Sequence, residues 1–428
     1  MTIDEAAIEP AKRDTSTAAP APPCRTAGAV ALLRIPALRR LFLARTISLF
    51  GDMIVPVALA FAVLDFGGGA TGLGIVLAAR VAPEVLLLLL GGAVGDRYPR
   101  RAVLIVSNGV ACLAQLLTGL LFVSGSAAIW SIAALAAVTG ATSAFFTPAS
   151  TAAIAHVAPD DERQAAYALF VMTANAAEVA GPSLAGVLLL VANPGWIIVL
   201  DAASFLVSAI LVGRAGTLGK QAVATAGRSL AAEIMSGLRY VRQTRWLSAL
   251  IASAGAFQLF LLATLSVLGP LVAHHDLGGP SAWAAIAAAL GAGGIVGSAL
   301  AMRVRPKRPL LVGYSLLLLG SGPTLILLAV PAPTMILVAT EFVAGIVIAY
   351  FESMEAATIA NRVPGTMLSR VDSVNRFGSM VLRPIGMACI GPVAVAVGLR
   401  PALVTAGVLT LMCVAAPLLL RDVRVLRD

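Results

Sequence analysis

Apolar residues run along this chain in long stretches, and short clusters of charged residues, Gly and Pro separate one stretch from the next. An α-helix of about 20 residues rises about 30 Å, which matches the thickness of the hydrocarbon core of a bilayer. The pattern therefore predicts twelve membrane-spanning helices and, because this number is even, places both chain termini on one side of the membrane. The predicted spans are 41–65, 71–93, 102–123, 127–150, 165–191, 195–213, 247–273, 281–302, 309–330, 334–358, 369–396 and 400–420.

The composition agrees with a membrane protein. Hydrophobic residues make up 59% of the 428 residues, charged residues make up 12%, and the mean hydropathy is +0.94. These values lie far outside the composition of soluble globular domains. We therefore expect an all-α polytopic membrane protein with little sequence left for a soluble domain.

Basic residues predict the orientation, because Lys and Arg are retained in cytoplasmic loops. Of the 30 basic residues, 25 fall in the two tails and in alternate turns between spans, whereas the remaining turns contribute Arg400 alone. We expect a multi-pass protein of the cell membrane, inner or plasma, with both termini in the cytoplasm. The net charge of +9 then describes this topology and does not indicate nucleic-acid binding.

The spans group into two sets of six. Residues 37–213 and 247–420 each hold six predicted helices, and the linker 214–246 contains apolar residues at helical spacing, which predicts an amphipathic helix at the membrane surface. Residues 1–36 include the stretch TSTAAPAPP and no apolar run. They are predicted to be a disordered cytoplasmic tail rather than a signal peptide, and 421–428 a second tail.

The two sets share a short repeat. The stretch AAIAHVAP at 152–159 aligns without gaps to ATIANRVP at 357–364, and each lies at the end of the fourth helix of its set. Parallel repeats of six helices are typical of transporters whose site lies between two halves at the middle of the membrane. The alternative is chance similarity between two Ala-rich stretches.

The turn between the second and third predicted helices reads GGAVGDRYPRR, residues 91–101. Here the chain resembles the major facilitator superfamily, whose signature in this turn is Gly, three residues, Asp, Arg, two residues and two basic residues. The matching positions are Gly92, Asp96, Arg97, Arg100 and Arg101. The resemblance implies the major facilitator fold of two pseudo-symmetric six-helix halves. It also implies a cytoplasmic gate in which Asp96 contacts the start of the eleventh predicted span, near Ser369 and Asp372. The alternative is that the arginines of this turn only enforce the topology.

Four further stretches are similar to the efflux branch of this superfamily, which includes macrolide exporters and enterobactin-type siderophore exporters. They are LRRLFLARTISLFGDMI, ATSAFFTPASTAAIAHVAP, GPSLAG and LDAASFLVSAILV. This resemblance implies a secondary active exporter that moves an amphipathic small molecule, of drug or siderophore type, out of the cytoplasm by proton antiport with alternating access. We expect it to act as a monomer. A proton-coupled uptake permease and a non-transporting membrane receptor are the alternatives.

Charged residues inside the spans are the main candidates for mechanism, because an ionised group at bilayer depth costs about 2.5–3.5 kcal/mol and must face protein or water. The candidates for proton coupling or for a substrate cavity are Asp52, Arg80, Glu84, Glu178, Glu341 and Arg383. We expect Asp52 or Glu84 to carry the proton. Arg80 and Glu84 lie one turn apart on one helix face, which predicts an ion pair that either titrates or is structural.

The remaining acid at bilayer depth, Asp201, is predicted to be a helix cap or a structural acid. The three histidines and four single cysteines form no Ser/His/Asp set and no metal-ligand spacing. We therefore expect no enzyme activity, no metal and no cofactor. The expected partners are a small-molecule substrate, protons and the lipid bilayer.

Overall fold

The computed structural model describes residues 29–159, 162–216, 218, 230–304 and 306–425. These residues form helices and turns without any β-strand, and twelve helical segments are long and apolar enough to cross a membrane. The first six spans are α1 (Pro36–Asp65), α2 (Gly69–Arg97), α3 (Arg100–Val123), α4 (Ile129–Val157), α5 (Arg163–Val191) and α6 (Pro194–Arg214). The predicted all-α class and number of spans are thus confirmed.

The second six spans include several interrupted helices. They are α8 (Arg245–Phe257) with η2 (Gln258–Leu262) and α9 (Ala263–Asp276), α10 (Pro280–Arg303), α11 (Pro309–Gly320) with α12 (Pro323–Leu328), α13 (Thr334–Arg362), α14 (Gly365–Met380) with α15 (Arg383–Val397), and α16 (Leu399–Ala415) with η3 (Ala416–Leu419). The short helices η1 (Ala29–Arg34), α7 (Leu230–Gln243) and α17 (Arg421–Val425) lie outside the spans.

Helix breaks in the second half have local causes. Pro323 and Pro384 lie in the first turns of α12 and α15, where the missing N–H removes a hydrogen bond to the preceding turn. Residues Gln258–Leu262 form a π-helical segment, a feature that is frequent at functional sites. One break places Arg383 at the first residue of α15.

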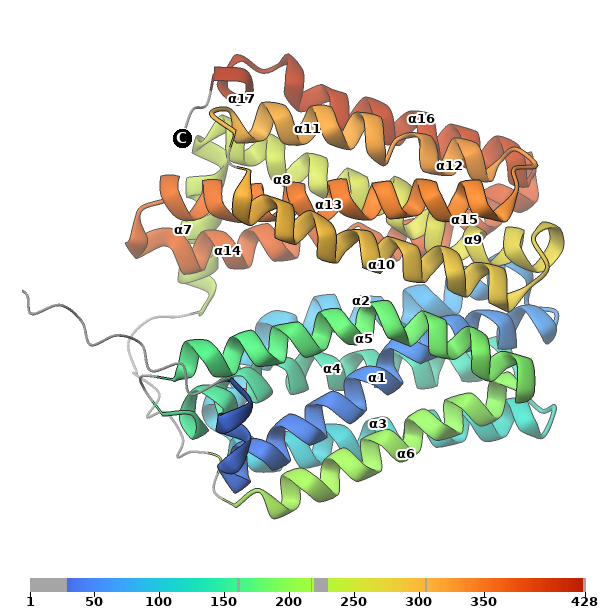
Figure 1. The fold of residues 1–428 in the computed structure, drawn as a ribbon, viewed down its shortest axis with the longest axis vertical. Helices are drawn as coiled ribbons and strands as arrows, with labels where there is room; N and C mark the ends of the chain where they lie inside the picture. The colour runs from blue at the N-terminus through green and yellow to red at the C-terminus, as the bar shows by residue number, and fades with distance from the viewer. Residues whose placement is uncertain (1–28, 160–161, 217, 219–229, 305, 426–428) are drawn as a thin grey trace, which may run out of the picture.

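The helices form two bundles of six spans, α1–α6 and α8–α16 (Figure 1). Within them, α2 packs against α4 and α10 packs against α13. These contacts are equivalent, because a Cβ at Gly140 would overlap the carbonyl oxygen of Arg80, and a Cβ at Gly345 would overlap that of Leu290. Across the two halves, α2 packs against α15 and α5 packs against α10. Both sets of contacts join corresponding helices of the two halves, so the halves are pseudo-symmetric.

The fourth helix of each half is longer than predicted. We expected ends at 150 and 358, whereas α4 continues to Val157 and α13 to Arg362. In each case one residue lies between the helix end and a proline, Pro159 or Pro364. Proline disfavours helical backbone at the position before it, which explains why both helices end there. The repeated stretch therefore marks the same helix end in both halves.

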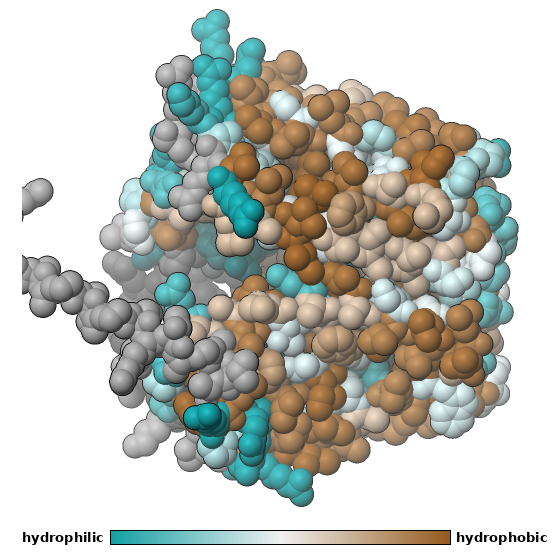
Figure 2. Space-filling model, viewed as in Figure 1, coloured by the Kyte–Doolittle hydropathy of each residue, from teal (hydrophilic) through white to brown (hydrophobic). Residues whose placement is uncertain are grey.

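Basic side chains gather at one end of the bundle. We call the end that carries α7, α17, Arg100, Arg163 and Arg308 the basic end, and the other the opposite end. Figure 2 shows apolar residues over much of the visible face and the most hydrophilic residues at the basic end. This distribution is expected for a multi-pass membrane protein.

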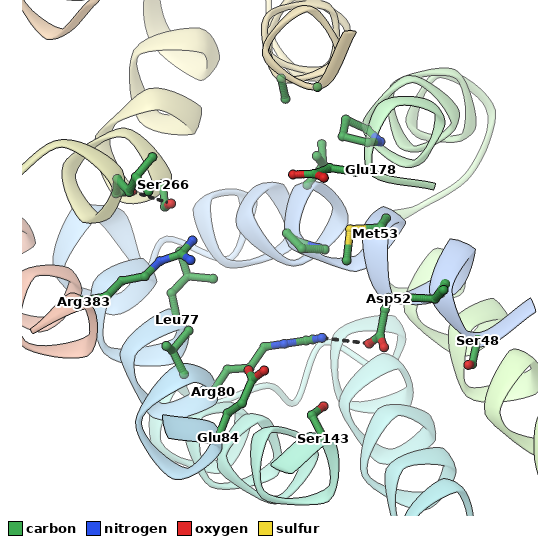
Figure 3. Close-up of a pocket in the computed structure, with 18 of the residues that line it drawn as sticks. Ser48, Asp52, Met53, Leu77, Arg80, Glu84, Ser143, Glu178, Ser266 and Arg383 are labelled. Carbon is green, nitrogen blue, oxygen red and sulfur yellow. Dashed lines mark hydrogen bonds and ion pairs between the residues drawn. The ribbon is translucent and has the colours of Figure 1, made fainter. Parts of the chain in front are cut away.

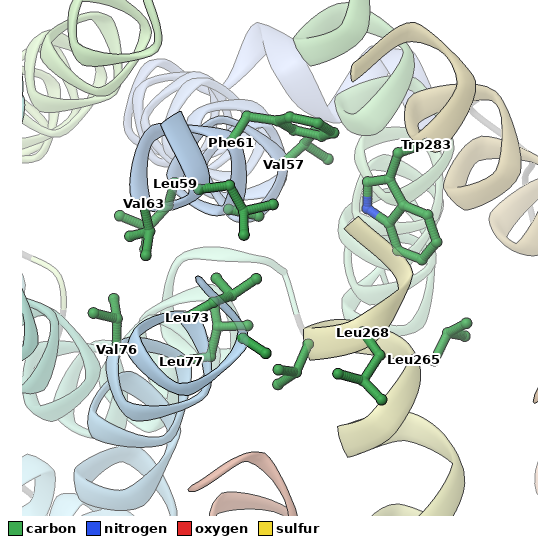
Figure 4. Close-up of a cluster of buried hydrophobic side chains, with 14 of the residues drawn as sticks. Val57, Leu59, Phe61, Val63, Leu73, Val76, Leu77, Leu265, Leu268 and Trp283 are labelled. Atoms are coloured by element: carbon green, nitrogen blue, oxygen red, sulfur yellow. The ribbon is translucent and has the colours of Figure 1, made fainter. Parts of the chain in front are cut away.

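The apolar core is joined across the halves only at the opposite end, among the described residues. One cluster combines side chains of α1 and α2 with side chains of α9 and α10, including Phe61, Leu73, Leu268 and Trp283 (Figure 4). At the basic end, one cluster belongs to the first half and another to the second half. His274 Nε2 also lies 3.1 Å from Asp65 Oδ1, which joins α9 to α1 at the opposite end. We call the shared cluster the apolar seal.

The structure describes only some residues of the predicted N-terminal tail and of the predicted linker. Residues 1–28 and 219–229 lie outside the described residues, so the predicted tail and much of the linker stay predictions. α7 lies where an amphipathic linker helix is predicted, and it packs against α14.

Candidate functional site

A cavity of about 590 Å³ lies between the two halves, next to the apolar seal. Its lining comes from both halves, and Val57, Leu77, Leu265 and Trp283 belong both to this lining and to the seal. All six charged residues singled out in the sequence line this one cavity: Asp52, Arg80, Glu84, Glu178, Glu341 and Arg383. The structure therefore brings them together, while their roles in transport stay predictions.

Arg80 forms an ion pair across two helices. Its Nη2 donates to Asp52 Oδ1 at 2.9 Å, and the two side chains are 16% and 20% exposed. We expected Arg80 to pair with Glu84 on its own helix; the structure gives an ion pair with Asp52 of α1, and Glu84 lies within the electrostatic influence of Arg80. Sequence spacing places Arg80 and Glu84 on one face of α2, but the contact between α1 and α2 decides which carboxylate the guanidinium reaches (Figure 3).

A buried acid lies behind this pair. Asp201 on α6 is 2% exposed and accepts hydrogen bonds from Gln115 Nε2 at 2.7 Å and Ser204 Oγ at 3.1 Å. A Cβ at Gly51 would overlap the Asp201 carboxylate, so α1 approaches α6 closely beside Asp52. Asp201 does not line the cavity. Asp201 joins α3 to α6 through Gln115 and lies against α1 at Gly51, whereas Asn193 caps the start of α6.

Glu84 and Arg383 carry opposite charges and interact electrostatically across the two halves. Glu84 lies on α2, Arg383 lies at the break before α15, and each contributes to the electrostatic environment of the other. The buried Nε of Arg383 has no hydrogen-bond partner in the described structure. The side of the cavity formed by α1, α2 and α15 thus carries the acids Asp52 and Glu84 and the basic residues Arg80 and Arg383, in addition to Arg45, which is described below.

The remaining two acids lie on the other side of the cavity. Glu178 extends from α5 into the cavity, away from Arg80 and Glu84 (Figure 3). Glu341 lies on α13, is 4% exposed, and its Oε2 has no hydrogen-bond partner among the described residues. Both carboxyl groups thus lie at the cavity wall outside the ion pair of Arg80 and Asp52.

One basic residue of the cavity was missed in the sequence. Arg45 on α1 lines the cavity, and its guanidinium carbon lies 5.1 Å from the ring centroid of Phe146. Its charge lies inside the predicted span 41–65, which was the available signal. The polar residues Asn108 and Ser143 also line the cavity, but sequence alone gives no reason to select them from the many polar residues in the spans.

The arginines of the signature turn bind helix ends of the first half. Arg100 Nη1 donates to the carbonyl oxygen of Ala152 at 3.4 Å, and Arg101 donates to that of Gly213. These bonds join the start of α3 to the second-last turn of α4 and to the last turn of α6, where carbonyl groups lack helix partners. Gly92, Asp96 and Arg97 belong to the last turns of α2, but their side chains lie outside the described structure, so the Asp96 gate stays a prediction.

Comparison with known proteins agrees with this architecture. The family model described as Major Facilitator Superfamily matches residues 41–339. The multidrug efflux pump Tap of Mycolicibacterium fortuitum is 26% identical over 407 residues, which cover 91% of this chain and 95% of that protein. Tap of Mycobacterium tuberculosis is 27% identical over 366 residues, covering 82% and 85%.

Solved structures share the fold at low sequence identity. The nucleoside transporter NupG superposes with a TM-score of 0.75 at 9% identity, covering 90% of this chain and 99% of that one. An inward-facing bacterial homologue of the lysosomal transporter Spinster gives 0.70 at 16% identity, covering 90% and 96%. The twelve spans, the cavity between pseudo-symmetric halves and the family match lead to one conclusion: this chain belongs to the major facilitator superfamily and is a membrane transporter, not an enzyme.

Proposed function

We propose that this protein is a secondary active exporter, which moves an amphipathic small molecule of drug or siderophore type out of the cytoplasm in exchange for protons. The observation that carries the proposal is one cavity that combines an ion pair, two further acids that belong to no ion pair among the described residues, and apolar walls. Similarity to the Tap efflux pumps supports the direction of transport. The basic end would face the cytoplasm, because basic loops are retained there.

Alternating access requires the two halves to separate at one end and to meet at the other. In the described state, the seal and the contacts of α2 with α15 and α5 with α10 join the halves toward the opposite end. The clusters of the basic end belong to one half each, which supports a cavity open to the cytoplasm. Rocking of the halves would break the seal and release substrate outside.

The arrangement of Arg80 suggests how a proton drives this change. A proton that binds Asp52 removes the negative charge that holds Arg80. Arg80 can then turn to Glu84, one helical turn away on α2. A proton taken up outside and released inside would thus make the Arg80 guanidinium exchange its partner on α1, Asp52, for its partner on α2, Glu84. Each charge that crosses 100 mV supplies about 2.3 kcal/mol, which is enough to concentrate a substrate many-fold.

Transport into inverted membrane vesicles with an acidic lumen tests the proposal. We expect wild-type vesicles to accumulate at least one compound from a panel of macrolides, cationic dyes and siderophores, and to release lumenal protons when that compound is added. Asp52→Asn should abolish the coupled release, whereas Asp276→Asn should keep it, because Asp276 is exposed at the opposite end and does not line the cavity.

The outcomes separate the parts of the proposal. Uptake and proton release that survive Asp52→Asn would keep the exporter and move the coupling proton to Glu84, Glu178 or Glu341. Accumulation that needs no gradient would contradict antiport. Compounds that enter only right-side-out cells would instead support the uptake permease.

A further inference from the structure

Charged residues are scarce at the opposite end. In the described structure, Asp65 at the end of α1 is the only charged residue that the first half places in the turns and helix ends there. The second half contributes His274, His275 and Asp276 at the end of α9, and Arg400 near the start of α16. An interaction between ionisable groups that joins the two halves at this end must therefore include Asp65.

Asp65 contacts one of these residues across the two halves. Its Oδ1 lies 3.1 Å from Nε2 of His274, and the side chains of Asp65 and His274 are 55% and 34% exposed. Asp276 and Arg400 instead line a separate small pocket that belongs to the second half. The contact between Asp65 and His274 thus selects one partner and is accessible to solvent.

The ring of His274 lies against α1 at the edge of the apolar seal. Its centroid is 6.1 Å from that of Phe61, which lies one helical turn before Asp65, is 1% exposed and belongs to the seal (Figure 4). The ring of His275 packs against that of His274 with centroids 5.2 Å apart, but among the described residues only His274 pairs with Asp65. The pair therefore lies on the solvent side of the seal.

Protonation changes the strength of this contact. A neutral imidazole can donate one hydrogen bond to the carboxylate, whereas an imidazolium adds the attraction between opposite charges. Histidine is the side chain whose charge ordinarily changes between about pH 5 and pH 8. The added attraction is present at acidic pH and is lost as the pH rises and the imidazole releases its proton. It acts only while the halves meet at this end, so it favours the closed state of the opposite end.

We propose that His274 and Asp65 form an external proton-binding site, a latch that holds the opposite end closed when the medium outside is acidic. This inference rests on the proposed orientation, which places the opposite end outside the cell, and it requires neither export nor a particular substrate. Neither residue lines the cavity. A proton bound at the latch therefore stays outside the transport path and regulates how often the opposite end opens.

Labelling of a cavity cysteine from outside measures this opening. In a cysteine-free background, Ser143→Cys lies in the cavity, so a membrane-impermeant thiol reagent reaches it in right-side-out vesicles only when the opposite end opens. The labelling rate is measured at an external pH of about 5.5 and of about 8, close to the limits of the usual titration range of histidine, with the internal pH held constant. The four proteins compared are this parent, His274→Gln, Asp65→Asn and the double variant.

At acidic pH, we expect each single substitution to raise the labelling rate about two- to five-fold, as expected for a partly exposed ion pair. The double variant should label no faster than the single variants, because both substitutions remove the same contact. At alkaline pH, each substitution should change the rate by less than about two-fold, because the imidazole is then neutral. Comparison of the four proteins at one pH cancels the effect of pH on the thiol and on the acids of the cavity.

Two further variants control for the neighbouring histidine and for charge. His275→Gln removes the adjacent imidazole but keeps the one that contacts Asp65, so labelling should still respond to His274→Gln at acidic pH. His274→Lys keeps a positive charge at both pH values and should label more slowly than His274→Gln at both.

Three results would overturn the latch: single variants that label like the parent at acidic pH, effects that multiply independently in the double variant, and effects of equal size at both pH values. Absence of transport in the vesicle assay is a separate result. It would contradict the export function and leave the labelling rates unchanged, because they report only the opening of the opposite end.

Discussion

Arg80 and Asp52 form an ion pair in the wall of the cavity, and both side chains are largely removed from solvent. Its bond to Asp52 is 2.9 Å long, and neither side chain is more than 20% exposed. Removing one member of a buried pair leaves the other charge without compensation, whereas removing both members removes that cost. Single and double substitutions of Asp52 and Arg80 therefore measure the energy of this contact.

We expect Asp52→Asn to lower the free energy of unfolding by about 1–3 kcal/mol, because Arg80 then remains charged and partly buried without its carboxylate. Adding Arg80→Gln should recover much of this loss. Reversible unfolding in mixed detergent micelles measures both values. The exposed pair of Asp372 and Arg376 is the control, since Asp372→Asn should cost no more than about 1 kcal/mol. Strictly additive losses in the double variant would contradict the Asp52–Arg80 contact.

Among the helices, α10 depends most visibly on small residues. Gly293 faces the backbone of α13 so closely that no Cβ fits, whereas a Cβ at the adjacent Gly294 would lie 3.8 Å from Ala349 Cβ, an ordinary contact. The close approach at Gly293 fixes where α13 presents Glu341 beside the cavity. Two neighbouring glycines of one helix thus have different tasks.

This difference predicts opposite effects of the same substitution. Gly293→Ala should separate α10 from α13, lower thermal stability and reduce transport, because the backbone of Phe342 cannot move aside as a flexible side chain would. Gly294→Ala should be neutral or should stabilise the helix by up to about 1 kcal/mol. Thermal unfolding and vesicle transport measure both variants. Equal effects would show that α10 and α13 do not pack at Gly293 as described.

The helices were largely predictable from sequence, whereas the contacts between them were not. Apolar stretches predict twelve spans, and the repeat at 152–159 and 357–364 marks equivalent helix ends. Charges within the spans identify six residues of the cavity, because such charges must face protein or water. The partner of Arg80 depends on how α1 meets α2, and the selection of Arg45 depends on which helix face points inward; neither is encoded in local spacing.

The complete bundle is closed at one end by side chains of both halves. The apolar seal joins α1 and α2 to α9 and α10, and the His274–Asp65 contact lies at the same end. The described clusters at the basic end do not cross between halves. In the state described here, the apolar seal therefore closes the cavity toward the opposite end.

Two cysteine substitutions test this access and the orientation together. In a cysteine-free background, Ser143→Cys lies in the cavity and Ser126→Cys lies in an exposed turn at the opposite end. We expect a membrane-impermeant thiol reagent to label Ser143→Cys in inverted vesicles, and Ser126→Cys only in right-side-out preparations. Labelling of both sites from the same side would contradict the proposed topology.

The measurement that tests the export mechanism most directly uses purified protein in liposomes, with lumenal pH and labelled substrate recorded together. An imposed proton gradient should drive substrate in the direction opposite to the protons, and reversal of the gradient should reverse the substrate flux. Movement of substrate and protons in the same direction would identify an uptake symporter, and substrate flux without proton movement would contradict proton coupling altogether.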